Sequence, residues 1–475
     1  MIRRTLITAA LLLAPVPLVA QQNPLKTEVE MLLAQSGPGL RYGLLVVDEE
    51  GREIVAIRPD ERFIPASNTK LFTTAAAYAR QAALDAQAGT SVRIEDGDVI
   101  LSGAGDAWLS SAPDCVASCL ATLADAVATR TRRVRDVVGD DTRFPDERWS
   151  QGMSWNNIPS RSGTASSALS LDDNELAMTV TPAAIGAPPT VTLAHYRVDN
   201  RALTIAGSAD TLAWDRAPNS DIVRLTGTIG VDAKPSVSRL GIDDPALHAA
   251  EMLRSMLVAR GVAVTGRAIT RHRPLAPADD PAKRKGTPAA RPPQPPALAT
   301  VPLPALTEGV PRINKPSQNL HAELLLRRVA LAEGSGSVAD GLAAERATFT
   351  QAGLPPTGFA FSDGSGMSTY NRVSPRGTVT LIRWARTQPW GAAWIDSLPI
   401  AGTDGTLARR FVGTPLQGKL FAKTGTLNAT NALAGTMTAA SGRTLTFAAY
   451  ANDVPDGVTA TAALDRALVA IAAAH

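Results

Sequence analysis

The stretch Pro65-Ala66-Ser67-Asn68-Thr69-Lys70 restricts this chain more than any other, because a serine and a lysine stand three residues apart where a helical run begins. On a helix, residues at that spacing share a face and can touch. A serine hydroxyl becomes a nucleophile when a neighbouring base takes its proton, and a lysine can be that base once burial or another cation lowers its pKa. A single SxxK is more often an ordinary helix cap beside a solvated lysine. The catalytic interpretation therefore needs support from elsewhere in the chain.

A second element, Ser317 and Asn319, stands just before the helical run Leu320–Leu331. Its hydroxyl can relay a proton, and its amide can hold both a substrate and Lys70. One competing SxN exists at Ser154-Trp155-Asn156, in a predicted loop with no helix behind it. We therefore assign the element to residues 317–319.

The third element, Lys423-Thr424-Gly425-Thr426, lies in a strand-like run. On an edge strand beside Ser67, a cation and hydroxyls can bind a carboxylate, and Gly425 lets a substrate backbone lie close. The backbone N–H groups of Ser67 and Thr426 can together form an oxyanion hole. SxxK and KTG each occur once, and with SxN they follow the order that a penicillin-recognising serine enzyme requires.

Two further stretches, residues 362–375 (SDGSGMSTYNRVSP) and 401–407 (AGTDGTL), extend this pattern. With them the chain resembles the class C low-molecular-mass penicillin-binding proteins, the D-alanyl-D-alanine carboxypeptidase/endopeptidase family. The resemblance covers essentially the whole mature chain, including Gly105-Asp106, Asp140-Asp141-Thr142 and residues 167–171 (SALSL).

The resemblance implies a role for each motif residue. Ser67 would be the acylated nucleophile, Lys70 its base, and Ser317 with Asn319 the proton relay. Lys423 and Thr424 would hold the terminal carboxylate of the substrate, with Gly425 and Thr426 beside them and with Met367 and Leu427 lining the cleft.

The expected fold is α+β, a transpeptidase/β-lactamase-like antiparallel sheet flanked by helices. Strand-like runs at Arg41–Val47 and Arg52–Arg58 near one end, and at Gly418–Thr426, Ala432–Thr438 and Arg443–Asn452 near the other, predict one sheet built from both ends. Two nested inserted domains rich in β-structure are expected between them. The predicted boundaries are residues 21–85 and 298–475 for the catalytic domain, 86–105 and 175–297 for inserted domain II with its proline-rich linker, and 106–174 for inserted domain III.

Residues 1–20 read as a secretory signal peptide, with Arg3 and Arg4 before an apolar run too short for a bilayer span. We therefore expect a periplasmic protein whose mature chain has no transmembrane anchor. A net charge of +3, from 47 basic and 44 acidic residues, argues against a nucleic-acid partner. Cys115 and Cys119, in a predicted helix over 112–129, allow either a disulfide or two small apolar contacts.

Several single residues also carry expectations. His248 and His321 are interpreted as helix-surface residues, and none of the five histidines sits in a hydrolase motif. Glu323, Glu333 and Glu345 lie in charged helical runs, and none is expected to act as a positioned base. Where relatives often carry an acidic pair after a tryptophan, this chain has Trp155-Asn156-Asn157, which leaves its stem-peptide side-chain preference open.

The sequence thus predicts a serine D-alanyl-D-alanine carboxypeptidase/endopeptidase that acts on peptidoglycan stem peptides, reacts with β-lactam antibiotics and needs no metal or organic cofactor. Two alternatives remain open. One is a serine β-lactamase or esterase of the same fold, and the other is a peptidoglycan-binding relative that no longer turns over.

Overall fold

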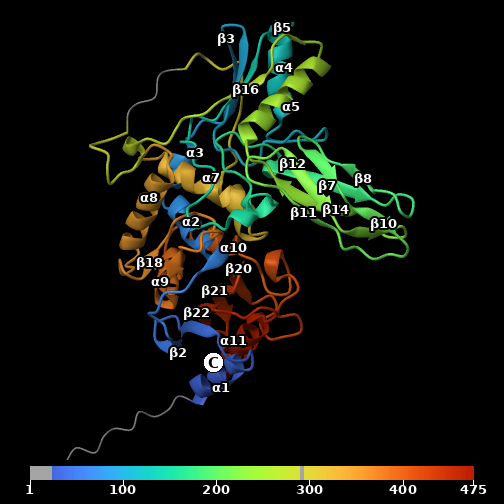
Figure 1. Ribbon diagram of the computed structural model, residues 1–475. Helices are drawn as coiled ribbons and strands as arrows, with labels where there is room; N and C mark the ends of the chain where they lie inside the picture. The colour runs from blue at the N-terminus through green and yellow to red at the C-terminus, as the bar shows by residue number, and fades with distance from the viewer. Residues whose placement is uncertain (1–23, 289–293) are drawn as a thin grey trace, which may run out of the picture.

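The computed structural model describes residues 24–288 and 294–475, so the predicted signal peptide at residues 1–20 lies outside the described residues. Figure 1 shows a helix-flanked sheet at one end of the molecule, with two further units beyond it that come from the middle of the chain. In the described ranges, no helix combines the length and apolar character needed to cross a bilayer.

The central sheet combines strands from both ends of the chain, as predicted. Its strands are β1 (Arg41–Val47), β2 (Glu53–Ile57), β20 (Leu420–Leu427), β21 (Thr430–Thr438) and β22 (Thr444–Asn452). They are antiparallel in the order β2-β1-β22-β21-β20, so the strand that carries KTG lies at an edge. The register of β1 against β22 pairs Arg41 with Asn452.

Helices cover both faces of this sheet. They are α1 (Pro24–Ala34), α2 (Thr69–Tyr78), α3 (Gln81–Asp85), α6 (Leu306–Asn314), α7 (Asn319–Ala330), α8 (Val338–Gln351), α9 (Pro375–Arg386), α10 (Gly391–Asp396) and α11 (Thr461–Ala474). Leu45 packs into the core shared with α2, α7 and α9, whereas Leu44 and Val46 pack into the core shared with α1 and α11. This alternation explains the uninterrupted apolar run of β1, because successive side chains of a strand point to opposite faces and both faces are buried.

A second five-stranded sheet lies between the SxxK helix and the SxN helix in the chain. Its elements are β3 (Thr90–Glu95), β4 (Asp98–Ser102), β6 (Val137–Asp140), β16 (Ala268–Arg271) and β17 (Ala299–Val301), with α4 (Leu120–Arg130) and α5 (Pro245–Ala259). The order is β16-β6-β4-β3-β17, and the two helices share its core. Hydrogen bonds between β4 and β6 therefore cross the predicted boundary at residues 105–106, and β17 extends the sheet past the boundary at 297–298. A short parallel pair, β5 (Arg133–Val134) with β15 (Ala263–Val264), adjoins it.

The nested unit that stands apart in Figure 1 is a small β-rich body. Its strands are β7 (Glu175–Thr181), β8 (Thr190–Thr192), β9 (Arg197–Asn200), β10 (Leu203–Ile205), β11 (Ala213–Asp215), β12 (Ile222–Thr226), β13 (Thr228–Gly230) and β14 (Ser236–Gly241). They form short sheets around a separate core that includes Met178, Val223 and Leu240. We propose that residues 175–242 form the innermost insertion, in place of the predicted 106–174, because the strand pairing and the core both divide there.

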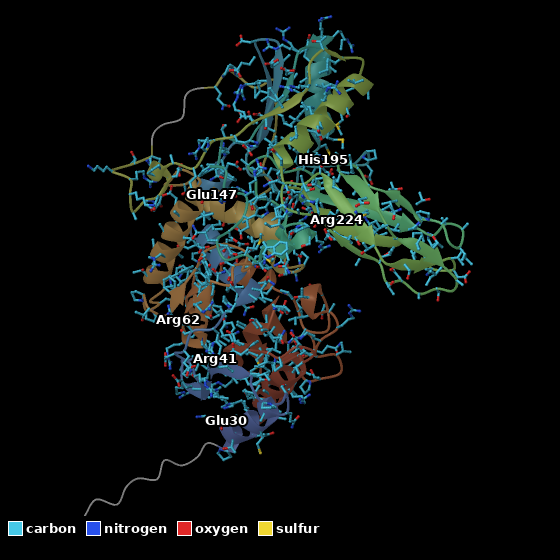
Figure 2. The ribbon with its side chains drawn as sticks, viewed as in Figure 1. Glu30, Arg41, Arg62, Glu147, His195 and Arg224 are labelled. Carbon is cyan, nitrogen blue, oxygen red and sulfur yellow. A yellow bond between two sulfur atoms is a disulfide. The ribbon has the colours of Figure 1, made fainter. Side chains whose placement is uncertain are left out.

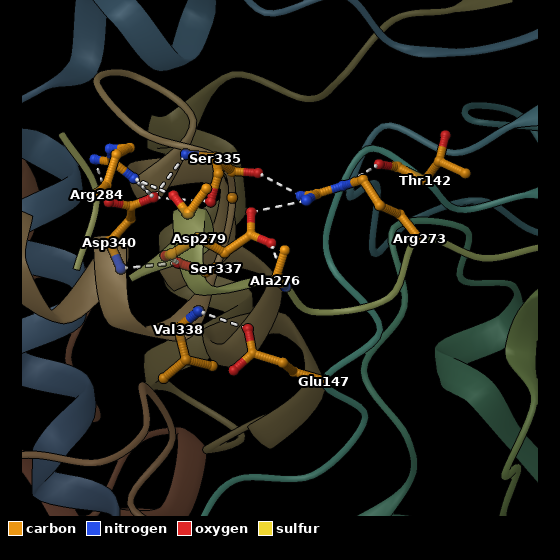
Figure 3. A network of polar contacts seen from close by, with 12 residues as sticks. Thr142, Glu147, Arg273, Ala276, Asp279, Arg284, Ser335, Ser337, Val338 and Asp340 are labelled. Atoms are coloured by element: carbon orange, nitrogen blue, oxygen red, sulfur yellow. Dashed lines mark hydrogen bonds and ion pairs between the residues drawn. The ribbon is translucent and has the colours of Figure 1, made fainter. Parts of the chain in front are cut away.

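Paired charges dock the inserted units on the beginning of α8, as Figure 3 shows. The Glu147 carboxylate accepts the backbone N–H of Val338 at 3.1 Å. Arg273 donates to the Ser335 carbonyl oxygen at 3.0 Å. Arg284 donates to both carboxylate oxygens of Asp340, at 2.9 and 3.0 Å. We call this set of contacts the docking seam.

Three local predictions were wrong. The helix predicted over 112–129 begins only at Leu120, because a disulfide closes residues 115–119 into a loop whose cysteine Cα atoms lie 5.7 Å apart. His248 and His321 are 7% and 8% exposed, so neither is a surface residue. The His321 ring is held by Asp173 at 2.6 Å, and the His248 ring packs against the ring of His195.

Candidate active site

Ser67 lies in a tight 3₁₀ turn, Ala66–Asn68, that leads directly into α2. The preceding Ala66 has a φ of +47°, a left-handed conformation that costs a non-glycine residue about 1–3 kcal/mol. Gly366 packs so close that a Cβ atom there would lie 1.9 Å from the Ala66 carbonyl oxygen. The turn is therefore held from outside by the 362–375 stretch, which explains the glycine in that motif.

Lys70 is fully buried and makes three hydrogen bonds. Its Nζ lies 2.8 Å from Ser67 Oγ, 2.7 Å from Asn319 Oδ1 and 2.6 Å from the Ser365 carbonyl oxygen. A neutral amine has two N–H donors and one lone pair, and these partners are two pure acceptors and one hydroxyl. The arrangement therefore suits a neutral Lys70 that accepts the Ser67 proton.

The electrostatics make this neutral form accessible. Burial lowers the pKa of Lys70 to about 7, although the carboxylates of Asp363 and Glu323 act in the opposite direction. A base with a pKa near the working pH is the efficient choice for proton transfer. Lys70 thus meets both the geometric and the acid–base requirement of a general base.

The second lysine of the site, Lys423, lies beside the SxN element. Its Nζ donates to Ser317 Oγ at 2.8 Å and to the Thr424 carbonyl oxygen at 3.0 Å. Burial, followed by the charge of Lys70, lowers the pKa of Lys423 well below its usual value. Ser317 itself has a φ of +64°, so a second strained residue stands at the site.

The KTG strand passes directly beside the SxxK turn. At Gly425 a Cβ atom would lie 2.6 Å from the Pro65 carbonyl oxygen. A glycine is therefore needed here for the strand to pack against the SxxK turn, and not only to let a substrate backbone lie close. Thr424 Oγ1 lies 2.7 Å from the hydroxyl of Thr406, in the 401–407 stretch. Because β20 is an edge strand, alternate backbone N–H groups point away from β21. Ala422, four residues before Thr426, donates its N–H on that side to the Pro399 carbonyl oxygen, so the Thr426 N–H also points outward and can serve as an oxyanion donor.

The two predicted cleft residues occupy different positions. Met367 is 9% exposed and lines a small cavity with Asn319 and Ser365. Leu427 is half-buried at the end of β20, where it pairs with Thr430. The structure thus brings Ser67, Lys70, Ser317, Asn319 and the KTG strand together, and it places Leu427 at the margin.

The sequence analysis named Glu323 only as a glutamate in a charged helical run and did not predict that it forms a carboxylate pair with Asp363 behind Lys70. Glu323 accepts the Ser365 N–H at 2.9 Å, and Asp363 accepts the Gly366 N–H at 2.9 Å. Together they fix the loop whose Ser365 carbonyl oxygen holds Lys70. Burial, and then Asp363, raises the pKa of Glu323 to about 7. The spacing could have signalled Glu323, since it stands four residues after Asn319 and so on the same helix face.

The inserted region also reaches the site. Asn319 Nδ2 donates to the Ser162 carbonyl oxygen at 2.9 Å, and Thr369 donates its N–H to the Gly152 carbonyl oxygen at 2.9 Å. Trp155, in the same loop, is 69% exposed. The competing Ser154-Trp155-Asn156 motif therefore lies in a solvent-facing turn, whereas Asn319 contacts Lys70.

The family assignment rests on the whole chain. The D-Ala-D-Ala carboxypeptidase 3 (S13) family matches residues 25–473. The chain belongs to this family. The D-alanyl-D-alanine carboxypeptidase of Actinomadura sp. is 32% identical over 445 residues, covering 88% of this chain and 79% of that protein. Carboxypeptidase DacB of Mycolicibacterium smegmatis is 29% identical over 470 residues, covering 95% of this chain and 84% of that protein.

The fold of this S13 peptidase agrees with a solved structure. Penicillin-binding protein 4 from Haemophilus influenzae superposes with a TM-score of 0.77 at 22% identity, covering 93% of this chain and 98% of that one. The predicted α+β fold and the resemblance to class C penicillin-binding proteins are confirmed, and the chain is a serine-type peptidase. The roles of the individual site residues stay predictions.

Proposed function

We propose that this S13 peptidase cleaves the bond between two D-alanines at the end of peptidoglycan stem peptides, through an acyl-enzyme on Ser67. The observation that carries the proposal is the 2.8 Å contact between Ser67 Oγ and a buried Lys70 whose other two partners are carbonyl oxygens. A relative that aligns with 88% of this chain is a D-alanyl-D-alanine carboxypeptidase, which supports this substrate class.

The reaction follows from the contacts. Lys70 takes the Ser67 proton as Oγ attacks the carbonyl carbon, and the oxyanion is stabilised by the N–H groups of Ser67 and Thr426. The departing D-alanine nitrogen then receives a proton through Ser317, which Lys423 holds at 2.8 Å. Water enters the vacated place and hydrolyses the ester, and cleavage of a crosslink is the same chemistry with a longer leaving group.

The positive side of the cleft suits a substrate that ends in a carboxylate. Lys423 and Thr424 lie on β20 next to the Ser67 turn, and a second cation, Lys70, lies close enough to lower the pKa of Lys423. A carboxylate bound here would offset the mutual repulsion of the two lysines. We therefore assign the terminal carboxylate of the stem peptide to Lys423 and Thr424.

The same nucleophile should react with β-lactams, as a structure of the Haemophilus influenzae protein in complex with a β-lactam suggests by analogy. A penicillin opened by Ser67 keeps its leaving group tethered, so the approach of water stays blocked. The ester should therefore persist far longer than in a peptide turnover. The site of action would be the periplasm, where stem peptides are found.

Intact-mass spectrometry with benzylpenicillin tests the assignment. The wild-type protein should gain one penicilloyl adduct, and Ser67→Ala should gain none. Ser154→Ala, which alters the competing motif, is the matched control and should react like wild type. A surviving adduct in Ser67→Ala would remove Ser67 from the centre of the mechanism.

A chase experiment separates this function from a β-lactamase. After labelling and removal of excess penicillin, release of D-alanine from a D-Ala-D-Ala peptide should recover slowly. Recovery within seconds would favour the β-lactamase. Among the described residues, no hydrogen bond joins Glu323 to Ser67, and the Glu323 carboxylate already accepts the Ser365 N–H. Glu323 is therefore not placed to activate water for deacylation. Absence of any D-alanine release would favour a binding protein without turnover.

A further inference from the structure

Three metal-ligating side chains gather where the β-rich unit meets helix α5. His195 comes from the loop between β8 and β9, and His248 and Glu251 stand three residues apart on α5, which places them on one helix face. One donor atom from each residue lies within 4.8 Å of the other two. In Figure 2 the His195 label marks this junction, between α5 and the β-rich unit.

The surrounding structure holds these side chains in place. The His195 and His248 rings meet edge to face with their centroids 5.3 Å apart, and His195 Nδ1 lies 3.0 Å from Glu251 Oε2. The Tyr196 ring also contacts the His195 ring, with centroids 4.8 Å apart, and the Tyr196 hydroxyl is hydrogen-bonded to the Gly241 carbonyl oxygen and the Asp243 N–H. The Glu251 side chain is 47% exposed and His195 is also accessible, which leaves a path from solvent to the buried His248 imidazole.

An ordinary ion pair between His195 and Glu251 explains only part of this arrangement. It assigns no role to His248, which is buried at the same point with its ring turned to a second imidazole. The His248 imidazole is sheltered from solvent, and the neutral imidazole is the form of histidine that binds a metal ion. A cation between the three donors would use all of them at once.

The spacing of the donors fits a small divalent ion. Ligands at about 2.0–2.2 Å from a tetrahedral zinc ion lie roughly 3.4 Å from one another. The donor atoms of His195 and Glu251 already lie 3.0 Å apart. All three donor atoms lie within 4.8 Å of one another, so small side-chain rotations would bring them to the spacing of zinc ligands. Two imidazoles and one carboxylate favour zinc and its transition-metal neighbours over magnesium or calcium, which prefer oxygen ligands alone.

We propose that His195, His248 and Glu251 bind one divalent transition-metal ion, with Zn²⁺ as the best match and a fourth position open to water. The ion would join the β8–β9 loop to α5 and so clasp the β-rich unit to the neighbouring five-stranded sheet. None of the three residues contacts the Ser67 site, so the role assigned to the ion is structural and not catalytic.

The test is a titration of the metal-stripped full chain with Zn²⁺ by calorimetry, together with the visible absorption of its Co²⁺ form. Because His248 is buried, variants are made at the two accessible ligands, as Glu251→Gln and His195→Asn. Each should weaken binding by at least about tenfold, the lower end of the loss seen when even a supporting contact to a metal ligand is removed. The matched controls Glu308→Gln and His475→Asn alter an exposed glutamate and an exposed histidine elsewhere and should bind like wild type.

The expected result is one Zn²⁺ per chain, a Co²⁺ spectrum typical of tetrahedral coordination, and a melting temperature that rises with Zn²⁺ concentration in wild type but not in the two ligand variants. The rate of penicillin acylation should stay unchanged. No binding by the wild-type protein would overturn the proposal and leave an ion pair only. Equal binding by wild type and both ligand variants would also overturn it, since the ion would then sit elsewhere.

Discussion

Buried charge serves different ends at the Ser67 site and at the docking seam. At the seam, Arg284 and Asp340 have side chains only 11% and 4% exposed, and they face each other directly. At the Ser67 site, Lys70 and Lys423 are equally sheltered, but their hydrogen bonds go to hydroxyls and amide or carbonyl oxygens, with the nearest carboxylates one layer behind. A paired arginine keeps its charge permanently, whereas a lysine without a direct counter-ion can lose its proton. The first arrangement fixes structure, and the second meets the requirements of the general base that we propose.

Replacing the base should separate the two regions most clearly. Lys70→Met should slow penicillin acylation by about 10²–10⁴-fold, the usual contribution of a general base. The melting temperature should not fall, because the substitution removes a buried cation that has no direct counter-ion. Stopped-flow acylation and calorimetry measure the two effects. A large loss of stability would show that Lys70 supports the fold as the seam arginines do.

Breaking the seam should give the opposite result. Asp340→Asn should lower the free energy of unfolding by about 3–5 kcal/mol, because it leaves the buried Arg284 without its partner. The double variant Arg284→Met with Asp340→Leu should recover much of that loss. The control is Asp221→Asn, in an ion pair with Arg197 at the surface, where the side chains of Arg197 and Asp221 are 72% and 64% exposed. This substitution should lower the free energy of unfolding by at most about 1 kcal/mol.

In these seam variants the acylation rate measured below the unfolding transition should remain that of wild type. The seam should also weaken in acid. Burial alone would raise the pKa of Asp340, but hydrogen bonds from Arg284 and Ser335 outweigh it and lower the pKa below its usual value. A depressed folded-state pKa stabilises the protein above the unfolded pKa, and this stability is lost as pH falls through the folded value.

The acid–base behaviour of Lys70 gives a smaller effect, on the acylation rate and not on stability, and it too increases as pH rises. Its folded pKa of about 7 means that the neutral base accumulates as pH rises, so acylation should increase about tenfold between pH 6 and pH 8. Because the Glu323 carboxylate raises the pKa of Lys70, Glu323→Gln should move this rise to lower pH. Glu333→Gln, at a side chain 74% exposed, is the matched control and should not move it. An unshifted profile in Glu323→Gln would remove that carboxylate from the electrostatics of the base.

The smallest effect on chemistry is expected in the loop that carries Trp155. Asn156→Ala and Asn157→Ala should leave hydrolysis of a small thioester substrate nearly unchanged while altering the rates on muropeptides. The loop touches the site through backbone groups of Gly152 and Ser162, and the Asn156 side chain faces solvent. Complete loss of thioesterase activity in both variants would place this loop in the catalytic centre.

The site residues could be predicted from the sequence where they lie close together in the chain, and could not be predicted where tertiary packing brings them together. Ser67 and Lys70 meet because a helix brings residues three apart together, and the strands of the central sheet could be predicted from their apolar runs. Asp363 and Ser162 reach the site through tertiary packing, which no local pattern reports. The nested boundary that we propose in place of 105–106 depends on distant contacts for the same reason, since β4 and β6 pair across the disulfide loop and α4.

The order of strands in the central sheet also determines when the enzyme can work. β1 is among the first elements of the chain, but its neighbour β22 is among the last, so the sheet can close only after more than 400 residues have been joined. Contacts of such long sequence separation make folding slow. The SxxK turn is made early, yet its neighbour β20 comes late, and a chain that lacks β20 has neither Lys423 nor the Thr426 N–H. Ser67 therefore lacks these partners until β20 has been synthesised and has joined the sheet, and acylation by a β-lactam reports the completed fold.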